Sequence, residues 1–218
     1  MRFAVIQFPG SNCDQDCVHV LSNVLGQQAD YLWHKEESVG DADAVVVPGG
    51  FSYGDYLRTG SIAQFSPVMS AVKAFADDGG LVIGICNGFQ IATEASLLPG
   101  VLMPNASLKF VCKDVLLRVE CANSPFTQNY SSGDLVRMPI AHRDGNYFAE
   151  VRELDALDAQ GLVAFRYCDA DGTLSPDANP NGSARNIAVI FNKERTILGM
   201  MPHPERLADI RTGGIDGK

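Results

Sequence analysis

Positive charge, long apolar runs and cysteines at metal-binding spacing are scarce or absent in this sequence. The 17 lysine and arginine residues are outnumbered by 26 aspartate and glutamate residues, and the formal net charge is −9. Because there is also no basic run or aromatic stacking motif, we expect no nucleic-acid partner. No apolar run approaches the ~18 residues of a membrane-spanning helix, and Met1–Gln7 is too short for a signal peptide. We therefore expect no membrane association.

The six cysteines form no C-x-x-C pair, and Cys13 and Cys17 do not complete a zinc set, so we expect no metal site. Cys112, Cys121 and Cys168 lie in strand-like runs and are expected to be buried thiols. A reactive thiol suits a reducing compartment better than a disulfide scaffold does, which predicts a cytoplasmic protein. The chain also lacks the G-x-x-x-x-G-K-[ST] loop that cradles nucleotide phosphates, so we expect no cofactor in this chain.

Strand and helix signals alternate through the first half of the chain. Strands are expected at 3–8, 29–33, 44–47 and 81–83, and helices at about 13–25 and 67–76, the second one capped by Ser66. This alternation predicts an α/β fold, a flavodoxin-like doubly wound and mostly parallel sheet flanked by helices. In the C-terminal half, additional antiparallel strands are expected, with a hairpin at 192–195 joining the last two. With 218 residues, the chain is expected to form a single domain, 1–218.

Cys86 is the most informative residue. The apolar run Leu81-Val82-Ile83 is followed by Gly84-Ile85-Cys86-Asn87-Gly88 and then by a helix-like segment. A cysteine at the apex of a strand–turn–helix, framed as G-x-C-x-G, is the thiol version of a nucleophile elbow. The helix N-terminus would favour the thiolate, which is the reactive form. The alternative is an inert, packed cysteine.

A cysteine nucleophile needs a base, and the base needs an orienting carboxylate. His203 and Glu205 lie two residues apart in the segment Met201-Pro202-His203-Pro204-Glu205-Arg206. Pro204 disfavours a helical His203, so an extended pair facing one side is expected. A third segment, Pro48-Gly49-Gly50, ends another apolar run. The backbone N–H groups of Gly50 and Asn87 are the candidate oxyanion hole. Taken alone, each segment also fits an ordinary surface turn.

Together these segments resemble the class I (triad) glutamine amidotransferases, and most closely the glutaminase subunits of phosphoribosylformylglycinamidine synthase. The resemblance rests on FPGSNCDQD (8–16), PGGFSYGDYLRTG (48–60), ICNGFQ (85–90), NPNGS (179–183) and GMMPHPER (199–206). It implies that Cys86, His203 and Glu205 form a catalytic triad that hydrolyses glutamine to glutamate and ammonia through a glutamyl thioester. Gln90 is implied as a glutamine-binding residue, although a solvent-facing helix position is equally compatible with its spacing. Phe51 and Arg58 would shape either the glutamine pocket or a partner surface.

The resemblance also implies protein partners. Ammonia would pass to an ATP-dependent synthetase subunit, which would use ATP and Mg²⁺ to convert formylglycinamide ribonucleotide to formylglycinamidine ribonucleotide in purine biosynthesis. A small bridging subunit would complete the complex. The segments 8–16 and 179–183 would either dock these partners or shape the rim of the active site. One departure from the family pattern is Arg143-Asp144, where Gly-Glu is usual. It leaves open the conformation of this loop and the role of His142.

Two other functions are compatible with parts of the pattern. Another member of the superfamily, such as a peptidase-like protein or an amidotransferase of a different pathway, would keep Cys86 but change the substrate. PGGFSYGDYLR and NPNGS argue against it. A non-catalytic thiol sensor would also place a cysteine at an elbow, but it would not need an oriented base such as His203.

Overall fold

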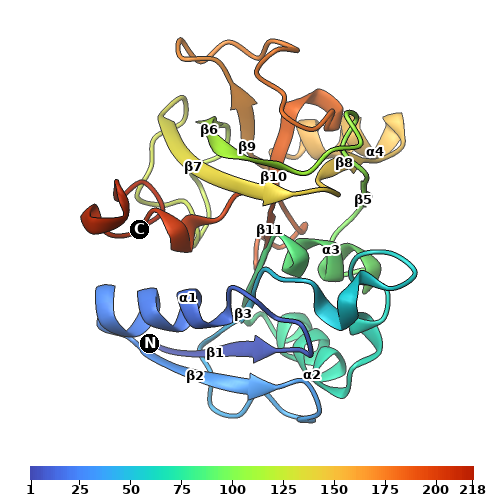
Figure 1. The fold of residues 1–218 in the computed structure, drawn as a ribbon, viewed down its shortest axis with the longest axis vertical. Helices are drawn as coiled ribbons and strands as arrows, with labels where there is room; N and C mark the ends of the chain where they lie inside the picture. The colour runs from blue at the N-terminus through green and yellow to red at the C-terminus, as the bar shows by residue number, and fades with distance from the viewer.

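The computed structural model describes residues 1–218, and its central feature is a nine-stranded sheet (Figure 1). Five strands are parallel and lie in the order β2-β1-β3-β4-β11: β1 (Arg2–Gln7), β2 (Gln28–Trp33), β3 (Ala44–Val47), β4 (Leu81–Ile85) and β11 (Ile197–Met200). This is the flavodoxin-like order 2-1-3-4-5, with β11 in the fifth place. The predicted fold class is confirmed.

The other four strands of the sheet are antiparallel and come from the second half of the chain. They continue the sheet as β10 (Ile187–Phe191), β9 (Val163–Cys168), β6 (Val111–Val119) and β7 (Leu135–His142). β10 and β11 form the expected hairpin. A separate two-stranded sheet pairs β5 (Val101–Met103) with β8 (Asn146–Phe148). In Figure 1 the parallel strands occupy the lower half of the molecule and the antiparallel strands occupy the upper half.

Four α-helices pack on this framework: α1 (Asp14–His19), α2 (Pro67–Asp77), α3 (Asn87–Glu94) and α4 (Val151–Ala159). α1 continues as a π-helical turn, Val20–Val24. Short 3-10 turns occur at Ser52–Asp55, Ala63–Phe65, Ala184–Asn186, Pro204–Arg206 and Ile210–Thr212. Ser66 precedes α2 as expected, but its side chain forms no capping bond and instead contacts the Tyr53 hydroxyl at 2.9 Å. None of these helices has the length and apolar character that crossing a membrane requires.

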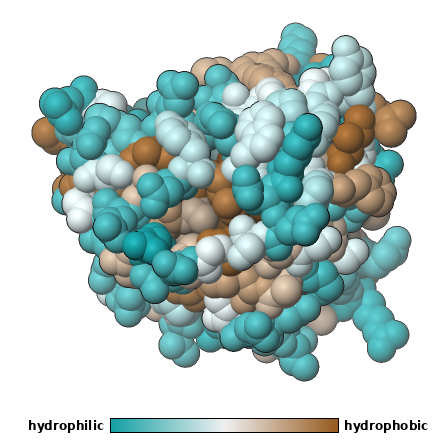
Figure 2. Space-filling view, turned by 90° about the horizontal axis from the view of Figure 1, so that it is seen from below, coloured by the Kyte–Doolittle hydropathy of each residue, from teal (hydrophilic) through white to brown (hydrophobic).

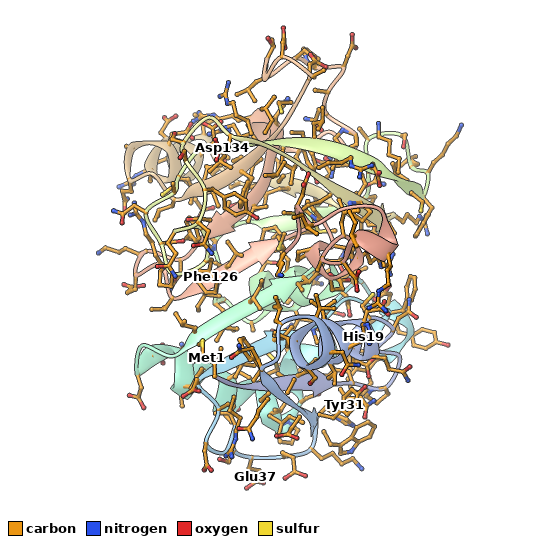
Figure 3. All side chains as sticks on the ribbon, turned by 90° about the vertical axis from the view of Figure 1, so that its left-hand side faces the viewer. Met1, His19, Tyr31, Glu37, Phe126 and Asp134 are labelled. Carbon is orange, nitrogen blue, oxygen red and sulfur yellow. The ribbon has the colours of Figure 1, made fainter.

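One cluster of buried apolar side chains runs through both halves, from Val45 in β3 to Phe191 in β10. In Figure 3 the lower half carries Met1, His19, Tyr31 and Glu37, and the upper half carries Phe126 and Asp134. Figure 2, which views the molecule from below, shows hydrophobic and hydrophilic residues interspersed over that face. Such mixing is ordinary for the surface of a globular protein.

The direction of strand addition reverses between β1 and β3, and the two loops that leave these strands lie against each other. The Phe51 N–H donates to the Gly10 carbonyl at 2.9 Å, and the Asn12 N–H donates to the Gly49 carbonyl at 3.3 Å. A Cβ atom on Gly50 would lie 2.8 Å from the Asn12 nitrogen, so only glycine fits there. In open α/β sheets, ligands bind at such a switch point, outside the carboxyl ends of the strands.

Candidate active site

Cys86 lies at the turn between β4 and α3 in a strained backbone conformation, with φ +51° and ψ −103°. Such a conformation costs on the order of 1–3 kcal/mol in a non-glycine residue and persists only where the surroundings impose it. Here they do: a Cβ atom on Gly88 would lie 1.9 Å from the Val47 carbonyl oxygen, so α3 approaches β3 as closely as a backbone can. The Cys86 N–H is held by the Met200 carbonyl at 2.7 Å. The thiol therefore sits at the N-terminus of α3 as the sequence predicted, and only 6% of the residue is exposed.

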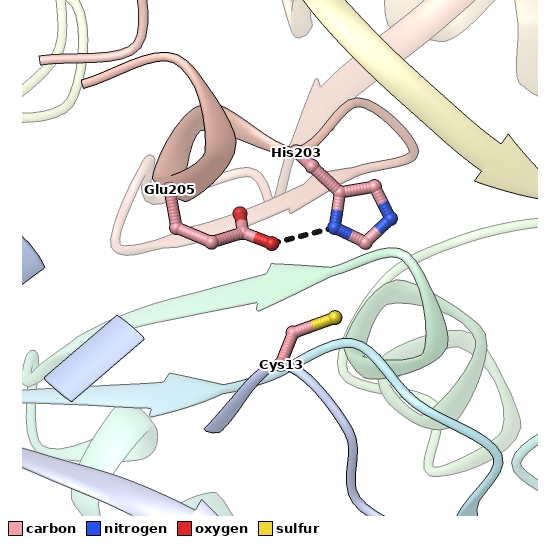
Figure 4. A group of neighbouring side chains, drawn as sticks. All are labelled: Cys13, His203 and Glu205. Carbon is pink, nitrogen blue, oxygen red and sulfur yellow. Dashed lines mark hydrogen bonds and ion pairs between the residues drawn. The ribbon is translucent and has the colours of Figure 1, made fainter. Parts of the chain in front are cut away.

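His203 and Glu205 are brought together just beyond the end of β11, as Figure 4 shows. His203 Nδ1 and Glu205 Oε1 are 2.6 Å apart, and the two side chains are 2% and 3% exposed. His203 is non-helical, with φ −108° and ψ 90°, but Pro204–Arg206 forms a 3-10 turn, so the expected extended pair is not what the structure shows. Because Nδ1 is held by Glu205, the nitrogen left for chemistry is Nε2, which is buried and has no hydrogen-bond partner.

The surroundings of His203 favour the charged imidazolium. Burial lowers the pKa of His203, but the Glu205 carboxylate and the neighbouring thiols of Cys86 and Cys13 outweigh it, so that the pKa is raised well above 6.5. A carboxylate on one ring nitrogen stabilises the positive charge that arises when the ring takes a proton on the other. A histidine that accepts the proton of a nearby thiol needs its imidazolium form to be stabilised in this way.

β7 crosses the active site, and the sequence did not indicate this. The carbonyl oxygen of Pro139 accepts a hydrogen bond from the His203 N–H at 2.8 Å, and the carbonyl of Ala141 lies 3.9 Å from Cys86 Sγ. Beyond the strand, the Asp144 carbonyl accepts from Gln90 Nε2 at 2.6 Å. One short strip of backbone thus contacts the candidate base, the candidate nucleophile and α3.

A buried chain of polar side chains joins the loop after β3, through Ser52, to the first turn of α3. Asn87 Oδ1 accepts from the Ser52 N–H at 3.1 Å and from Ser52 Oγ at 2.5 Å, and Asn87 Nδ2 donates to Gln90 Oε1 at 2.9 Å. The Gly50 N–H has no acceptor in the structure. Asn87 is the first residue of α3, so its N–H has no acceptor within the helix. Neither N–H is therefore engaged by a backbone acceptor of the chain.

The three expected substrate-binding residues differ in their surroundings. Gln90 is 4% exposed, so the solvent-facing alternative is wrong, and its side-chain amide joins Asn87 to Asp144. Phe51 is half exposed beside Gly50. The Arg58 guanidinium forms two 2.6 Å hydrogen bonds with Glu94 near the end of α3, while its side chain is 68% exposed. Arg58 is therefore already paired within the chain.

The NPNGS segment is largely internal, which favours the rim-shaping interpretation over docking. Asn181 and Ser183 are 1% and 3% exposed, and both donate to the Gly145 carbonyl, at 2.8 and 3.1 Å. The loop that carries the Arg143-Asp144 departure is held through its backbone, since the Arg143 carbonyl accepts from the Asn105 N–H at 2.7 Å.

His142 is a buried neutral histidine that holds this loop. Its Nδ1 lies 3.1 Å from Asn105 Oδ1, so Nδ1 carries the proton. Burial and the positive charge of His203 lower the pKa of His142 from 6.5 to about 4. A folded-state pKa below the unfolded value means that the unfolded chain binds the proton first.

We expect acid to destabilise the protein through His142. Its contribution to the free energy of unfolding should be full above pH 6.5 and should be lost as the pH falls through about 4. The loss is on the order of 3 kcal/mol. Urea unfolding between pH 4 and 7 measures this loss. The free energy of unfolding should change less steeply with pH in His142→Gln than in wild type, and as steeply as in wild type in a variant of the exposed His19. If the free energy of unfolding depended equally on pH in wild type and His142→Gln, His142 would not be the buried neutral histidine described here.

Two cysteines are placed differently from the sequence expectation. Cys112 is exposed and Cys121 is partly exposed, so of the three strand cysteines only Cys168 is buried as predicted. Cys13 is 1% exposed and belongs to the site, since its sulfur lies within 4.8 Å of the ligand atoms of His203 and Glu205. Spacing could not reveal this neighbour because 190 residues separate the segments.

The comparisons with known proteins agree with this geometry. The family model for the CobB/CobQ-like glutamine amidotransferase domain matches residues 1–212. Phosphoribosylformylglycinamidine synthase subunit PurQ of Moorella thermoacetica is 56% identical over 218 residues, covering 100% of this chain and 92% of that protein. The corresponding subunit of Salinibacter ruber is 52% identical over 217 residues, with 100% and 92% coverage.

Solved structures give the same result. A chain in the structure of PurLQS from Thermotoga maritima superimposes with a TM-score of 0.88 at 39% identity, covering 99% of this chain and 93% of that one. The glutaminase domain of Trypanosoma brucei CTPS with bound acivicin shares the fold, with a TM-score of 0.62 at 16% identity and coverage of 100% and 90%. The protein is thus a member of the glutamine amidotransferase class. Within that class, the chain belongs to the family of phosphoribosylformylglycinamidine synthase subunits PurQ.

Proposed function

We propose that this chain hydrolyses glutamine with Cys86 as nucleophile, His203 as base and Glu205 as the group that orients His203. The observation that carries the proposal is the buried 2.6 Å contact between His203 Nδ1 and Glu205 Oε1, which leaves Nε2 unpartnered at the site. A thiol sensor needs no such oriented base. The geometry therefore supports catalysis over sensing.

The reaction begins when His203 Nε2 takes the Cys86 proton and the thiolate attacks the side-chain amide carbon of glutamine. The negative oxygen that forms accepts hydrogen bonds from the N–H groups of Gly50 and Asn87. His203 then returns the proton to the departing nitrogen, and ammonia leaves the glutamyl thioester. Water, deprotonated by His203, hydrolyses the thioester to glutamate and restores the thiol. We propose Phe51, Arg58 and Gln90 as glutamine-binding residues, and of these Gln90 is joined directly to Asn87.

The PurLQS structure and the names of the relatives support protein partners for this chain. Ammonia would pass to an ATP-dependent synthetase subunit, assembled with a small bridging subunit, that amidates formylglycinamide ribonucleotide. ATP and Mg²⁺ would bind the synthetase. All six cysteines are free thiols, which suits the reducing cytoplasm, where we place the complex.

The test compares two nitrogen sources. The chain would be mixed with the cognate synthetase and bridging subunits, ATP, Mg²⁺ and formylglycinamide ribonucleotide. We expect product formation from glutamine to require this chain and to release glutamate in equal amount. With ammonium chloride, the product should form without the chain. Glutamine-dependent product in the absence of the chain, or no glutamate release in the full mixture, would refute the proposal.

A further inference from the structure

Cys13, His203 and Glu205 form a compact set of three different ligand atoms. The sulfur, a ring nitrogen and a carboxylate oxygen all lie within 4.8 Å of one another, and all three residues are buried. In Figure 4 the Cys13 sulfur lies on one side of the His203–Glu205 pair, below the His203 ring. Gly49 leaves room beside His203 and Cys13, since a Cβ atom there would lie 2.8 Å from His203 Cε1 and 3.1 Å from Cys13 Sγ.

One buried atom of this cluster, Glu205 Oε2, has no hydrogen-bond partner and no part in the proposed reaction. An unpartnered polar atom in the interior is costly, so its presence points to a ligand. Sulfur, imidazole nitrogen and carboxylate oxygen together are a donor set that zinc prefers. We propose that Cys13, His203 and Glu205 bind a thiophilic divalent cation, with Zn²⁺ as the natural fit, and that its binding blocks the active site.

The Arg206 guanidinium also contacts the Cys13 sulfur. Its Nη2 donates to Cys13 Sγ at 3.0 Å, and a guanidinium has only donors, so the sulfur is the acceptor. This cation competes with a metal for that sulfur. The Arg206 side chain is about one-third exposed and can turn toward solvent when the ion enters.

Binding replaces protons with metal. Zn²⁺ bonds to Cys13 Sγ as thiolate, to His203 Nδ1 and to the Glu205 carboxylate, and the protons that the thiol and Nδ1 carried pass to solvent. The 2.6 Å separation between Nδ1 and Oε1 must open to roughly 3.3 Å to accommodate bonds of about 2.0 Å. Glu205 then no longer accepts from Nδ1–H, so His203 loses the support that its role as a base requires.

The inhibitory effect rests on the proposed function, whereas metal binding does not. We would therefore measure binding first, by equilibrium dialysis with Zn²⁺ and by the visible spectrum with Co²⁺, in which thiolate ligation adds a sulfur-to-metal charge-transfer band. Wild type should bind the ion and show this band. Cys13→Ala should bind at least roughly 100-fold more weakly and lose the band, since even outer ligand partners contribute ten- to a hundredfold.

Three further variants control the result. Cys13→Ser keeps the size of the side chain and should lose the band without loss of folding. Cys112→Ala removes an exposed thiol and should bind like wild type. Arg206→Gln removes the competing cation and should tighten binding. No binding by wild type, wild-type binding by both Cys13 variants, or loss of binding in Cys112→Ala would overturn the site.

Glutaminase assays then separate the two proposals. Zn²⁺ should inhibit wild type more strongly than Cys13→Ser. If the chain binds Zn²⁺ through Cys13 but never hydrolyses glutamine in the complete mixture, the metal site stands and the proposed function fails. If glutamine is hydrolysed and Zn²⁺ does not bind, the proposed function stands and the metal site fails.

Discussion

Replacing Cys86 with alanine is expected to abolish glutamine hydrolysis, with kcat falling by roughly 10⁵-fold or more. Removal of the nucleophile of a triad costs about as much as removal of the whole triad, because His203 and Glu205 act only through it. The measurement is glutamate release by the chain in complex with its partners. The buried Cys168 lies in β9 and offers a matched control, and Cys168→Ala should retain activity. More than about 1% residual activity in Cys86→Ala would contradict the assignment.

The strained backbone at the same position predicts a separate effect on stability. Because Cys86 has φ +51°, alanine keeps the backbone strain and glycine relieves it. Cys86→Gly should therefore be about 1 kcal/mol more stable than Cys86→Ala, although both are inactive. Urea unfolding of the two variants measures the difference. Equal stability would mean that the elbow is not strained.

Replacing Glu205 with glutamine is expected to lower kcat by about 10³- to 10⁴-fold while glutamine still binds. The carboxylate accepts from His203 Nδ1–H, whereas a glutamine amide can present its NH₂ group to Nδ1 and stabilise the wrong tautomer. The proton would then sit on Nε2, and His203 could not accept the Cys86 proton. Steady-state kinetics measures the loss. Glu194→Gln is a matched control in the hairpin at the opposite end of β11, and it should leave kcat unchanged.

The Glu205→Gln variant also changes how stability depends on pH. The pKa of His203 is raised in the folded state, so its contribution to stability is full below the unfolded value of 6.5 and is lost as the pH rises through the folded value. Removal of the carboxylate removes most of this contribution. The difference in unfolding free energy between wild type and Glu205→Gln should therefore be largest below pH 6.5 and should shrink as the pH rises. A difference that grows with pH would contradict the charged-pair interpretation.

Two features of the site, the turn at Cys86 and the His203–Glu205 pair, were predictable from the sequence because residues close together in the chain form them. The G-x-C-x-G turn at Cys86 follows from the order strand, tight turn and helix, and the structure shows why both glycines are needed there. His203 and Glu205 are two residues apart, so their contact needs no long-range information. The doubly wound, mostly parallel part of the sheet was also predictable, since alternating strands and helices favour parallel neighbours.

The remaining features were decided by the tertiary structure, because they depend on which distant segments meet. β7 is at the edge of the sheet, five places from β4 in the strand order, yet its last residues contact Cys86 and His203. Cys13 follows β1 and meets His203 only because β1 and β11 end at the same edge of the sheet. Asn181 reads as part of a polar loop and is buried under Gly145. The sequence by itself therefore determined the elbow, the His203–Glu205 pair and the family of the protein. Only the packing of the sheet determined what surrounds them, since contacts between remote segments follow from strand order and not from spacing along the chain.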